Sequence, residues 1–114
     1  MENRIIVDGD LLERDEVSLP ANSEGLSYGF GLFETIKIRN GLPCFFDEHF
    51  ARHKTGVSAA GIDLNFSKEE LFLQAKVLIE SMRVADGALK ITTSKAGSRS
   101  LTYLYFKRVS AMGK

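Results

Sequence analysis

The centre of the chain carries the strongest constraint on its fold. Apolar and polar residues alternate over Glu34–Arg39, which places Ile36 and Ile38 on one face of an extended strand. Asn40–Gly41 follows, and this pair readily adopts the two positive φ angles of a type I′ turn. Leu42–Phe46 then provides the returning strand. This hairpin restricts the chain to folds that contain an antiparallel sheet.

A segment with helical periodicity follows the hairpin. Asp47 is positioned to cap a helix that runs to about Ala60, where Gly61 ends it. The apolar face of this helix is predicted to comprise Phe46, Phe50, Val57 and Ala60.

A second helix has a more complete start signal. Ser67–Glu70 matches a capping box, and Phe66 and Leu71 stand at the two positions of a hydrophobic staple. Apolar residues then recur at helical spacing, which predicts a stripe that faces the core. The stripe comprises Leu71, Phe72, Ala75, Leu78, Ile79 and Met82.

The N-terminal region predicts a hairpin and a long loop. Arg4–Val7 is short and β-branched, Asp8–Asp10 is a turn signal, and Leu11–Leu12 is expected to return as an edge strand. Asp15–Gly31 is rich in Ser, Asn and Gly without a sustained period, so it predicts a long ordered loop. Such loops in compact domains are often functional.

Two strands are predicted near the C-terminus, Ala88–Thr93 and Leu101–Phe106, with the polar loop Ser94–Ser100 between them. The element order β-β-β-β-α-α-β-β predicts an α+β fold. We expect a two-layer sandwich in which an antiparallel-rich sheet carries two helices on one face. The length of 114 residues predicts a single domain, 1–114.

Composition argues against several classes of partner and site. Fifteen basic and fifteen acidic residues balance in short runs, which disfavours nucleic acid and membrane surfaces as partners. Neither a signal peptide nor a spanning helix is evident, so a cytoplasmic location is expected. Cys44 is the single cysteine, which excludes an intrachain disulfide or a cysteine metal cluster, and we expect a packed thiol.

Two motifs resemble the class IV, fold-type IV pyridoxal-phosphate enzymes, which are branched-chain aminotransferases, D-amino-acid aminotransferases and aminodeoxychorismate lyases. Tyr28–Ile36 reads Y-G-F-G-L-F-E-T-I, against Y-G-D-G-L-F-E-T-I in the family, and His49–Arg52 reads H-F-A-R, against H-L-x-R. The resemblance implies the small N-terminal domain of such an enzyme. It also implies pyridoxal phosphate as the cofactor of the complete enzyme and a small amino acid or keto acid as its substrate.

The resemblance implies roles for three residues. Arg52 matches the arginine that binds the cofactor phosphate, and the alternative is a surface arginine paired with Glu48 one turn earlier. Phe33 matches a wall of the substrate pocket. Arg99 lies near the place where such aminotransferases keep an arginine for the substrate carboxylate, and the alternative is a solvated loop cation.

Several motifs are weak. Gly29 and Gly31 lack the context of a nucleotide-binding loop, so they serve either positive-φ turns or a close approach of the backbone. His49 and His53 have the i, i+4 spacing of metal ligands, but no further ligand completes a site. We therefore predict no metal, and we expect His53 to be partly buried and neutral.

No catalytic residue is predicted within the chain. In the family the Schiff-base lysine belongs to a C-terminal domain, which would be absent from a chain that ends at Lys114, and Lys90 is not taken as its equivalent. We expect a chain that is inactive alone and retains no cofactor. It would form a homo-oligomer or join a chain that carries the second domain. The alternative is a non-catalytic α+β binding or assembly module that docks a partner chain.

Overall fold

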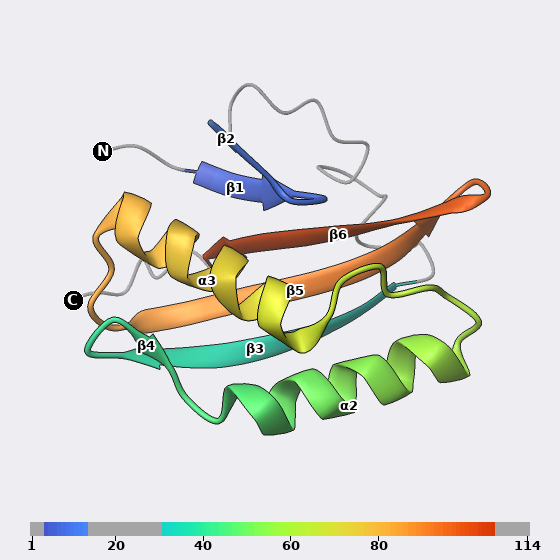
Figure 1. Cartoon of the computed structure of the whole chain (residues 1–114), viewed down its shortest axis with the longest axis horizontal. Coiled ribbons are helices and arrows are strands. Elements are labelled where there is room, and N and C mark those ends of the chain that lie inside the picture. The colour runs from blue at the N-terminus through green and yellow to red at the C-terminus, as the bar shows by residue number, and fades with distance from the viewer. Residues whose placement is uncertain (1–3, 14–30, 107–114) are drawn as a thin grey trace.

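The computed structural model describes residues 4–13 and 31–106, and its two helices lie over one face of an antiparallel sheet (Figure 1). The elements are β1 (Arg4–Val7), β2 (Asp10–Glu13), β3 (Gly31–Arg39), β4 (Leu42–Pro43), α2 (Phe46–Ala59), α3 (Lys68–Met82), β5 (Gly87–Ala96) and β6 (Arg99–Phe106). The six strands follow the order β2-β1-β6-β5-β3-β4. The predicted α+β sandwich is confirmed.

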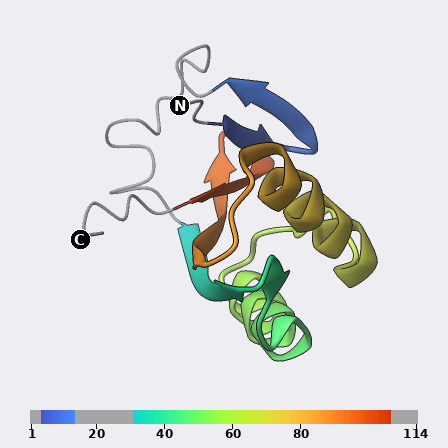
Figure 2. The ribbon, with the colours of Figure 1, turned by 90° about the vertical axis from the view of Figure 1, so that its left-hand side faces the viewer.

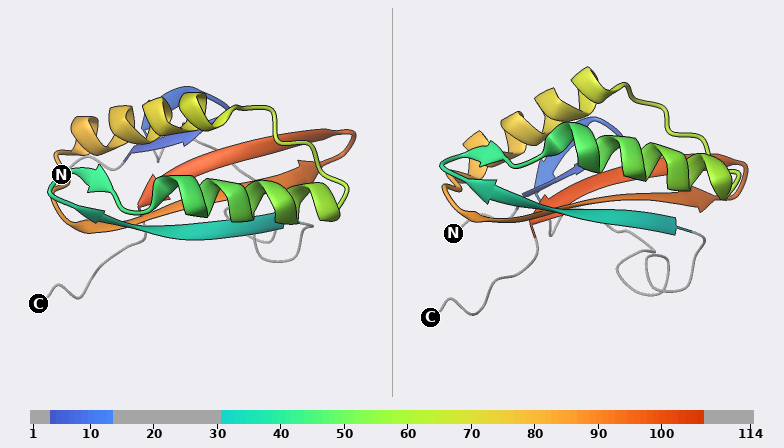
Figure 3. Two further views of the ribbon diagram at one scale, coloured as in Figure 1. Left: turned by 60° about the horizontal axis from the view of Figure 1, so that its bottom comes forward. Right: turned by 90° about the horizontal axis from the view of Figure 1, so that it is seen from below.

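The core lies between the sheet and the helices (Figure 2). Its buried members come from four strands and both helices: Ile6, Ile36, Ile38, Phe46, Leu71, Ala75, Leu78, Ile79, Leu89, Ile91 and Leu104. Figure 3 shows α2 and α3 side by side on this face. A smaller apolar cluster around Ile5 and Tyr103 involves β1, β2 and β6. Since Val7 pairs with Tyr103 and Ile6 with Leu104, alternation places this cluster on the opposite face.

The central hairpin forms as predicted, although its second strand is short. Asn40 and Gly41 have φ angles of 54° and 73°, as a type I′ turn requires. The predicted strand Leu42–Phe46 is wrong beyond Pro43, because Phe45 adopts a left-handed conformation with φ 54°. That reversal ends the pairing and turns the chain into α2.

The start of α2 also differs from the prediction. Phe45 is the N-cap residue and makes no side-chain cap, whereas Asp47 lies inside the first turn. Phe46 is 5% exposed and meets the ring of Phe72 edge-on at 5.3 Å, so burial of an aromatic ring fixes where this helix begins. Ala60 is exposed rather than part of the apolar face.

Helix α3 agrees with its sequence signals. The Ser67 hydroxyl accepts from the Glu70 backbone N–H at 3.1 Å, and the Glu70 carboxylate accepts from the Ser67 N–H at 2.8 Å. Leu71, Ala75, Leu78 and Ile79 are buried. Neither described helix combines the length and the hydropathy that a bilayer crossing requires.

The predicted loop Ser94–Ser100 is mostly strand. β5 and β6 pair as far as Ala96 and Arg99, and only Gly97–Ser98 turns between them. The reason is that polar side chains here find partners: the Ser100 hydroxyl donates to the Asp63 carbonyl at 2.6 Å and accepts from the Asn65 amide at 3.2 Å. The predicted loop Asp15–Gly31 lies outside the described residues, apart from Gly31, which begins β3.

Candidate functional site

A buried carboxylate at the start of β3 organises the candidate site. Glu34 has the same strand parity as Ile36 and Ile38, so it faces the helices, and its side chain is 10% exposed. An ion buried to this extent is costly unless it is paired and hydrogen-bonded. Glu34 was not among the predicted site residues, although an acid at a core-facing position of an alternating strand indicates that its carboxylate needs a partner.

Two residues of α2 supply those partners. Arg52 donates from Nε to Oε2 and from Nη2 to Oε1, both at 2.9 Å. His49 Nδ1 lies 2.8 Å from Oε1. A carboxylate only accepts, so Nδ1 carries the hydrogen in this contact. We call these three residues the Glu34 cluster.

Glu34 and Arg52 are both ionised at neutral pH. The hydrogen bond from Arg52 lowers the pKa of Glu34, burial opposes this, and the hydrogen bond from His49 lowers it further. Glu34 in turn raises the pKa of Arg52. Glu34 and Arg52 therefore form a charged pair whose geometry is bidentate.

Arg52 is both anchored and exposed. Its ion pair is with Glu34 on the neighbouring strand, not with Glu48 on its own helix, and its side chain is 71% exposed. A guanidinium has five N–H donors, of which the pair with Glu34 uses two. Nη2 also passes 3.5 Å from His49 Nδ1, where both nitrogens approach the same carboxylate oxygen. Within the part of the chain that the structure describes, three donors thus remain for another acceptor.

The cluster lies at an open edge of the described sheet. On one side β3 pairs with β5 from Gly31 to Ile38, and on the other side β4 pairs only with Ile38 and Arg39. Within residues 4–13 and 31–106, no strand pairs with the outer side of β3 before Ile38. Among these residues, the outer backbone groups of β3 before Ile38 therefore have no strand partner.

Close approach explains one of the motif glycines. A Cβ on Gly31 would lie 3.0 Å from the Ser94 Cβ and 3.2 Å from the Thr93 carbonyl oxygen, so a side chain there would force these neighbours to shift. Gly31 has no positive φ, which favours close approach over a turn at this position. Gly29 lies outside the described residues.

Phe33 lies at the same edge on the opposite face of β3. The residue is 59% exposed, and its backbone is paired across the sheet with Thr92. The Lys90 ammonium lies 4.1 Å from the ring centroid, a cation–π contact. Phe33 and Arg52 thus flank one strand edge from its two faces.

Arg99 lies elsewhere. It begins β6, two strands from β3, and pairs with Ala96 at the tip of the β5–β6 hairpin. Its side chain is 70% exposed, and Nη2 lies 3.8 Å from Asp8 Oδ2. The structure brings Arg52 and Phe33 to one edge and does not bring Arg99 to them.

The two histidines of α2 point to different surroundings. His53 is 3% exposed, so it is more deeply buried than predicted, and its Nε2 lies 2.9 Å from the Thr93 hydroxyl, which contacts the Thr102 hydroxyl at 3.0 Å. Burial lowers the pKa of His53, so it is neutral at pH 7. The described residues contain no cluster of His, Cys, Asp and Glu suited to a metal ion.

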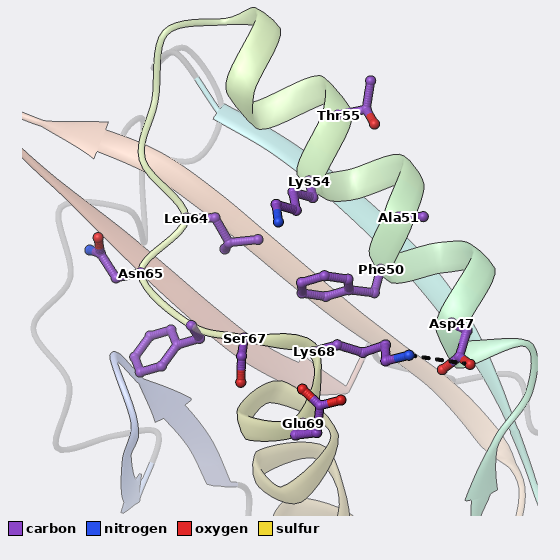
Figure 4. A pocket seen from close by; sticks show the side chains of 11 residues that line it. Asp47, Phe50, Ala51, Lys54, Thr55, Leu64, Asn65, Ser67, Lys68 and Glu69 are labelled. Carbon is purple, nitrogen blue, oxygen red and sulfur yellow. Dashed lines mark ion pairs between the residues drawn. The ribbon is translucent and has the colours of Figure 1, made fainter.

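A groove on the helical side of the molecule lies away from these residues. It has a volume of about 760 Å³ and runs between α2 and the start of α3, and Phe50, Lys54 and Leu64 point into it (Figure 4). Lys68 and Asp47 form an ion pair of 3.5 Å at one end. Helical spacing puts Lys54 and Arg52 on different sides of α2. The groove therefore contains none of the predicted site residues.

Comparisons with known proteins agree with the motifs. Residues 31–110 match the family model described as amino-transferase class IV. The chain is 37% identical over 95 residues to a D-alanine aminotransferase of Bacillus licheniformis, covering 82% of this chain and 34% of that protein. It is 28% identical over 92 residues to a D-alanine aminotransferase of Staphylococcus aureus strain N315, covering 81% and 33%. The chain thus spans about a third of the length of these relatives.

Solved structures share the fold. The branched-chain amino acid aminotransferase of Escherichia coli superposes with a TM-score of 0.79 at 16% identity, over 95% of this chain and 41% of that one. A hypothetical aminotransferase from Mycobacterium tuberculosis, in a form with α-ketoglutarate and PMP bound, gives a TM-score of 0.77 at 23% identity, over 95% of this chain and 40% of that one.

Proposed function

Because the chain belongs to the class IV aminotransferase family, we propose that it supplies the phosphate-binding side of a pyridoxal-phosphate site, with Arg52 as the phosphate ligand. Proteins of this family use pyridoxal phosphate. The observation that carries the proposal is the Arg52 guanidinium, fixed by two hydrogen bonds to Glu34 while its side chain is 71% exposed. A phosphate monoester is recognised well by a fixed, permanently charged fork of donors.

The reaction proposed for the complete protein is amino transfer between an amino acid and a keto acid, or elimination from aminodeoxychorismate. The D-alanine aminotransferase relatives favour amino transfer. Bound pyridoxal phosphate would supply the electron sink for this chemistry. The part of this chain is to hold the phosphate through Arg52 and to shape the substrate side with Phe33.

Arg99 is the weaker part of the proposal. As a ligand for a substrate carboxylate it would have to leave the 3.8 Å contact with Asp8 and reach past β5 toward Phe33. Arg99→Ala is expected to leave phosphate binding unchanged, because Arg99 is remote from the Glu34 cluster.

Phosphate recognition can be tested by calorimetry with pyridoxamine 5′-phosphate, which has no aldehyde to react with surface lysines. We expect the wild-type chain to bind it and to bind unphosphorylated pyridoxamine much more weakly. Arg52→Ala should abolish the difference between the two compounds, and Arg52→Lys should recover little, because an ammonium has no planar fork. Arg83→Ala, at an exposed arginine beyond α3, is the matched control. Equal binding of both compounds by the wild-type chain contradicts the role of Arg52.

We further propose that the chain alone is not a catalyst. A lysine that reacts with the cofactor at neutral pH needs a lowered pKa and a fixed position. Lys90, which lies beside the candidate site, is instead held over the Phe33 ring. The purified chain should be colourless after incubation with pyridoxal phosphate and dialysis, and show no turnover of D-alanine with a keto acid. Activity should appear when a chain that carries the second domain is added. Cofactor retained through dialysis and lost in Lys90→Ala would overturn this.

Association with a second chain completes the proposal. Several large apolar side chains are exposed on the described residues: Leu11, Phe33, Leu42, Phe45, Leu73 and Val77. A companion, either another copy or the chain with the second domain, would cover those of these side chains that lie in its interface. Sedimentation should reveal a dimer or larger species at micromolar concentration. The same exposure is what a non-catalytic assembly module requires, and phosphate-specific binding separates the two functions.

A further inference from the structure

We propose that Glu34 is a positioning residue that orients Arg52 for a phosphate monoester. The inference rests on the proposed function of Arg52 and adds a role for a residue that does not itself touch the phosphate. It begins from the way in which the two side chains meet: Glu34 contacts the side edge of the guanidinium, formed by Nε and Nη2, through one oxygen on each nitrogen.

This side-on pairing decides which donors of Arg52 are left. Both hydrogens of Nη1 and the second hydrogen of Nη2 remain. The second Nη2 hydrogen and one Nη1 hydrogen form the end edge of the guanidinium. That edge presents two parallel N–H groups, the geometry in which arginine holds phosphate with two bonds. Glu34 thus takes one edge of the fork and leaves the other for an anion.

The anchor itself is rigid. Glu34 lies on the buried face of β3, and its backbone is paired with Ile91. Its Oε1 also accepts from His49 at 2.8 Å, which restrains the carboxylate from a second direction. By contrast, the side chain that it holds is 71% exposed and without this pair would sample many rotamers.

Charge and orientation make opposite predictions for this residue. The Glu34 carboxylate repels a nearby phosphate, so on charge alone its removal would tighten phosphate binding. If Glu34 orients Arg52, its removal weakens binding, because the fork must then be ordered by the ligand. Salt separates the two effects, because the Debye length falls from about 30 Å at 0.01 M to about 3 Å at 1 M.

The first experiment needs no ligand. The Nε–H group of Arg52 in the wild-type chain should give a sharp NMR signal with slow solvent exchange and a rigid order parameter. Arg39, exposed on the same strand, should not. Glu34→Gln should make Arg52 resemble Arg39. Glu48→Gln, which removes the same charge from α2 one turn before Arg52, should leave the Arg52 signal unchanged. An Arg52 signal in the wild-type chain that is as mobile as that of Arg39 overturns the proposal.

The second experiment titrates the wild-type chain, Glu34→Gln and Glu48→Gln with pyridoxamine 5′-phosphate at low and high salt. At about 1 M salt, Glu34→Gln should bind about three- to tenfold more weakly than the wild-type chain, the size expected when the ligand must order an arginine. Glu48→Gln should bind as the wild-type chain does. Thermal unfolding of each variant verifies that binding is measured on folded protein.

The outcomes separate the two claims. In one outcome, the wild-type chain binds at Arg52 while Glu34→Gln binds equally well or more tightly at high salt. That result overturns the role of Glu34 and leaves the function of Arg52 intact. Absence of phosphate-specific binding in the wild-type chain contradicts the proposed function and the positioning role together. Weaker binding at high salt with a mobile Arg52 signal in Glu34→Gln supports both.

Discussion

The two halves of β3 have the same alternation of buried and exposed side chains, but the buried positions have different roles. In the C-terminal half, Ile36 and Ile38 face the helices and are fully buried, and Ile38 is paired on both sides. In the N-terminal half, the next position of the same parity is Glu34, and among the described residues this half is paired with β5 only. The packed C-terminal half of β3 can therefore hold the polar N-terminal half in a defined geometry at an open edge of the described sheet.

Removing packing from the C-terminal half should have the largest effect on stability. Ile36→Ala leaves a cavity in the core between sheet and helices and is expected to lower the free energy of unfolding by about 2–5 kcal/mol. Urea unfolding measures this change. If the two halves are separable, the variant that stays folded should keep the rigid Nε–H signal of Arg52. A loss of that signal in folded Ile36→Ala would contradict the separation.

Loss of the buried contact between His53 and Thr93 should have a smaller effect on stability. Thr93→Val removes the hydroxyl that contacts both His53 Nε2 and the Thr102 hydroxyl, and it is expected to cost about 1–3 kcal/mol. His53→Leu combined with Thr93→Val removes both polar groups, so the double variant should be more stable than Thr93→Val alone. A double variant that is less stable than Thr93→Val would show that the hydrogen bond is not the cause.

A side chain at the start of β3 should disturb the N-terminal half directly. Gly31→Ala places a Cβ 3.0 Å from that of Ser94 and is expected to cost about 1 kcal/mol, the lower end for overpacking. Ser94→Gly should recover part of the loss in Gly31→Ala, while the contact with the Thr93 carbonyl remains. Thermal unfolding of the three variants tests this, and an unchanged Gly31→Ala would contradict the close approach.

Acid should lower the free energy of unfolding in two separate pH ranges, an upper and a lower window. Burial lowers the pKa of His53 below its ordinary value of 6.5. The unfolded chain therefore takes up a proton first, and the free energy of unfolding falls from about pH 6.5 down to the folded pKa. Arg52 and His49 lower the pKa of Glu34 below 4.5 despite burial. Its contribution is present above about 4.5 and is lost as pH falls through the lower folded pKa.

These windows can be assigned with two variants. His53→Leu should flatten the upper window, and Glu34→Gln should flatten the lower one. Urea unfolding across the acidic range provides the measurement. An upper window that persists in His53→Leu would assign it to another group.

Much of the fold was predictable because its signals are local. The Asn40–Gly41 turn, the capping box at Ser67 and the apolar stripe of α3 depend on residues within a few positions of each other. The start of α2 was not predictable from local signals, because a contact between Phe46 and Phe72 outweighs the capping preference of Asp47. The extended β5–β6 hairpin was missed because Ser100 finds its partners far along the chain.

The candidate site was also predictable only where its signals are local. The motif around Arg52 indicated a phosphate ligand, and that role remains a prediction. The bidentate pair with Glu34 joins residues 18 positions apart, and no local pattern specifies it. Glu34 was nevertheless visible as an acid in line with Ile36 and Ile38.

The location of phosphate binding tests the central claim most directly. The described residues offer two cationic places on α2, Arg52 at the β3 edge and Lys54 in the groove beside α3. Backbone and side-chain NMR shifts should be recorded as pyridoxamine 5′-phosphate is added to the wild-type chain. We expect saturable shifts at Glu34, His49 and Arg52, with little change at Lys54 and Lys68. Shifts confined to the groove, or none at Arg52, would contradict it.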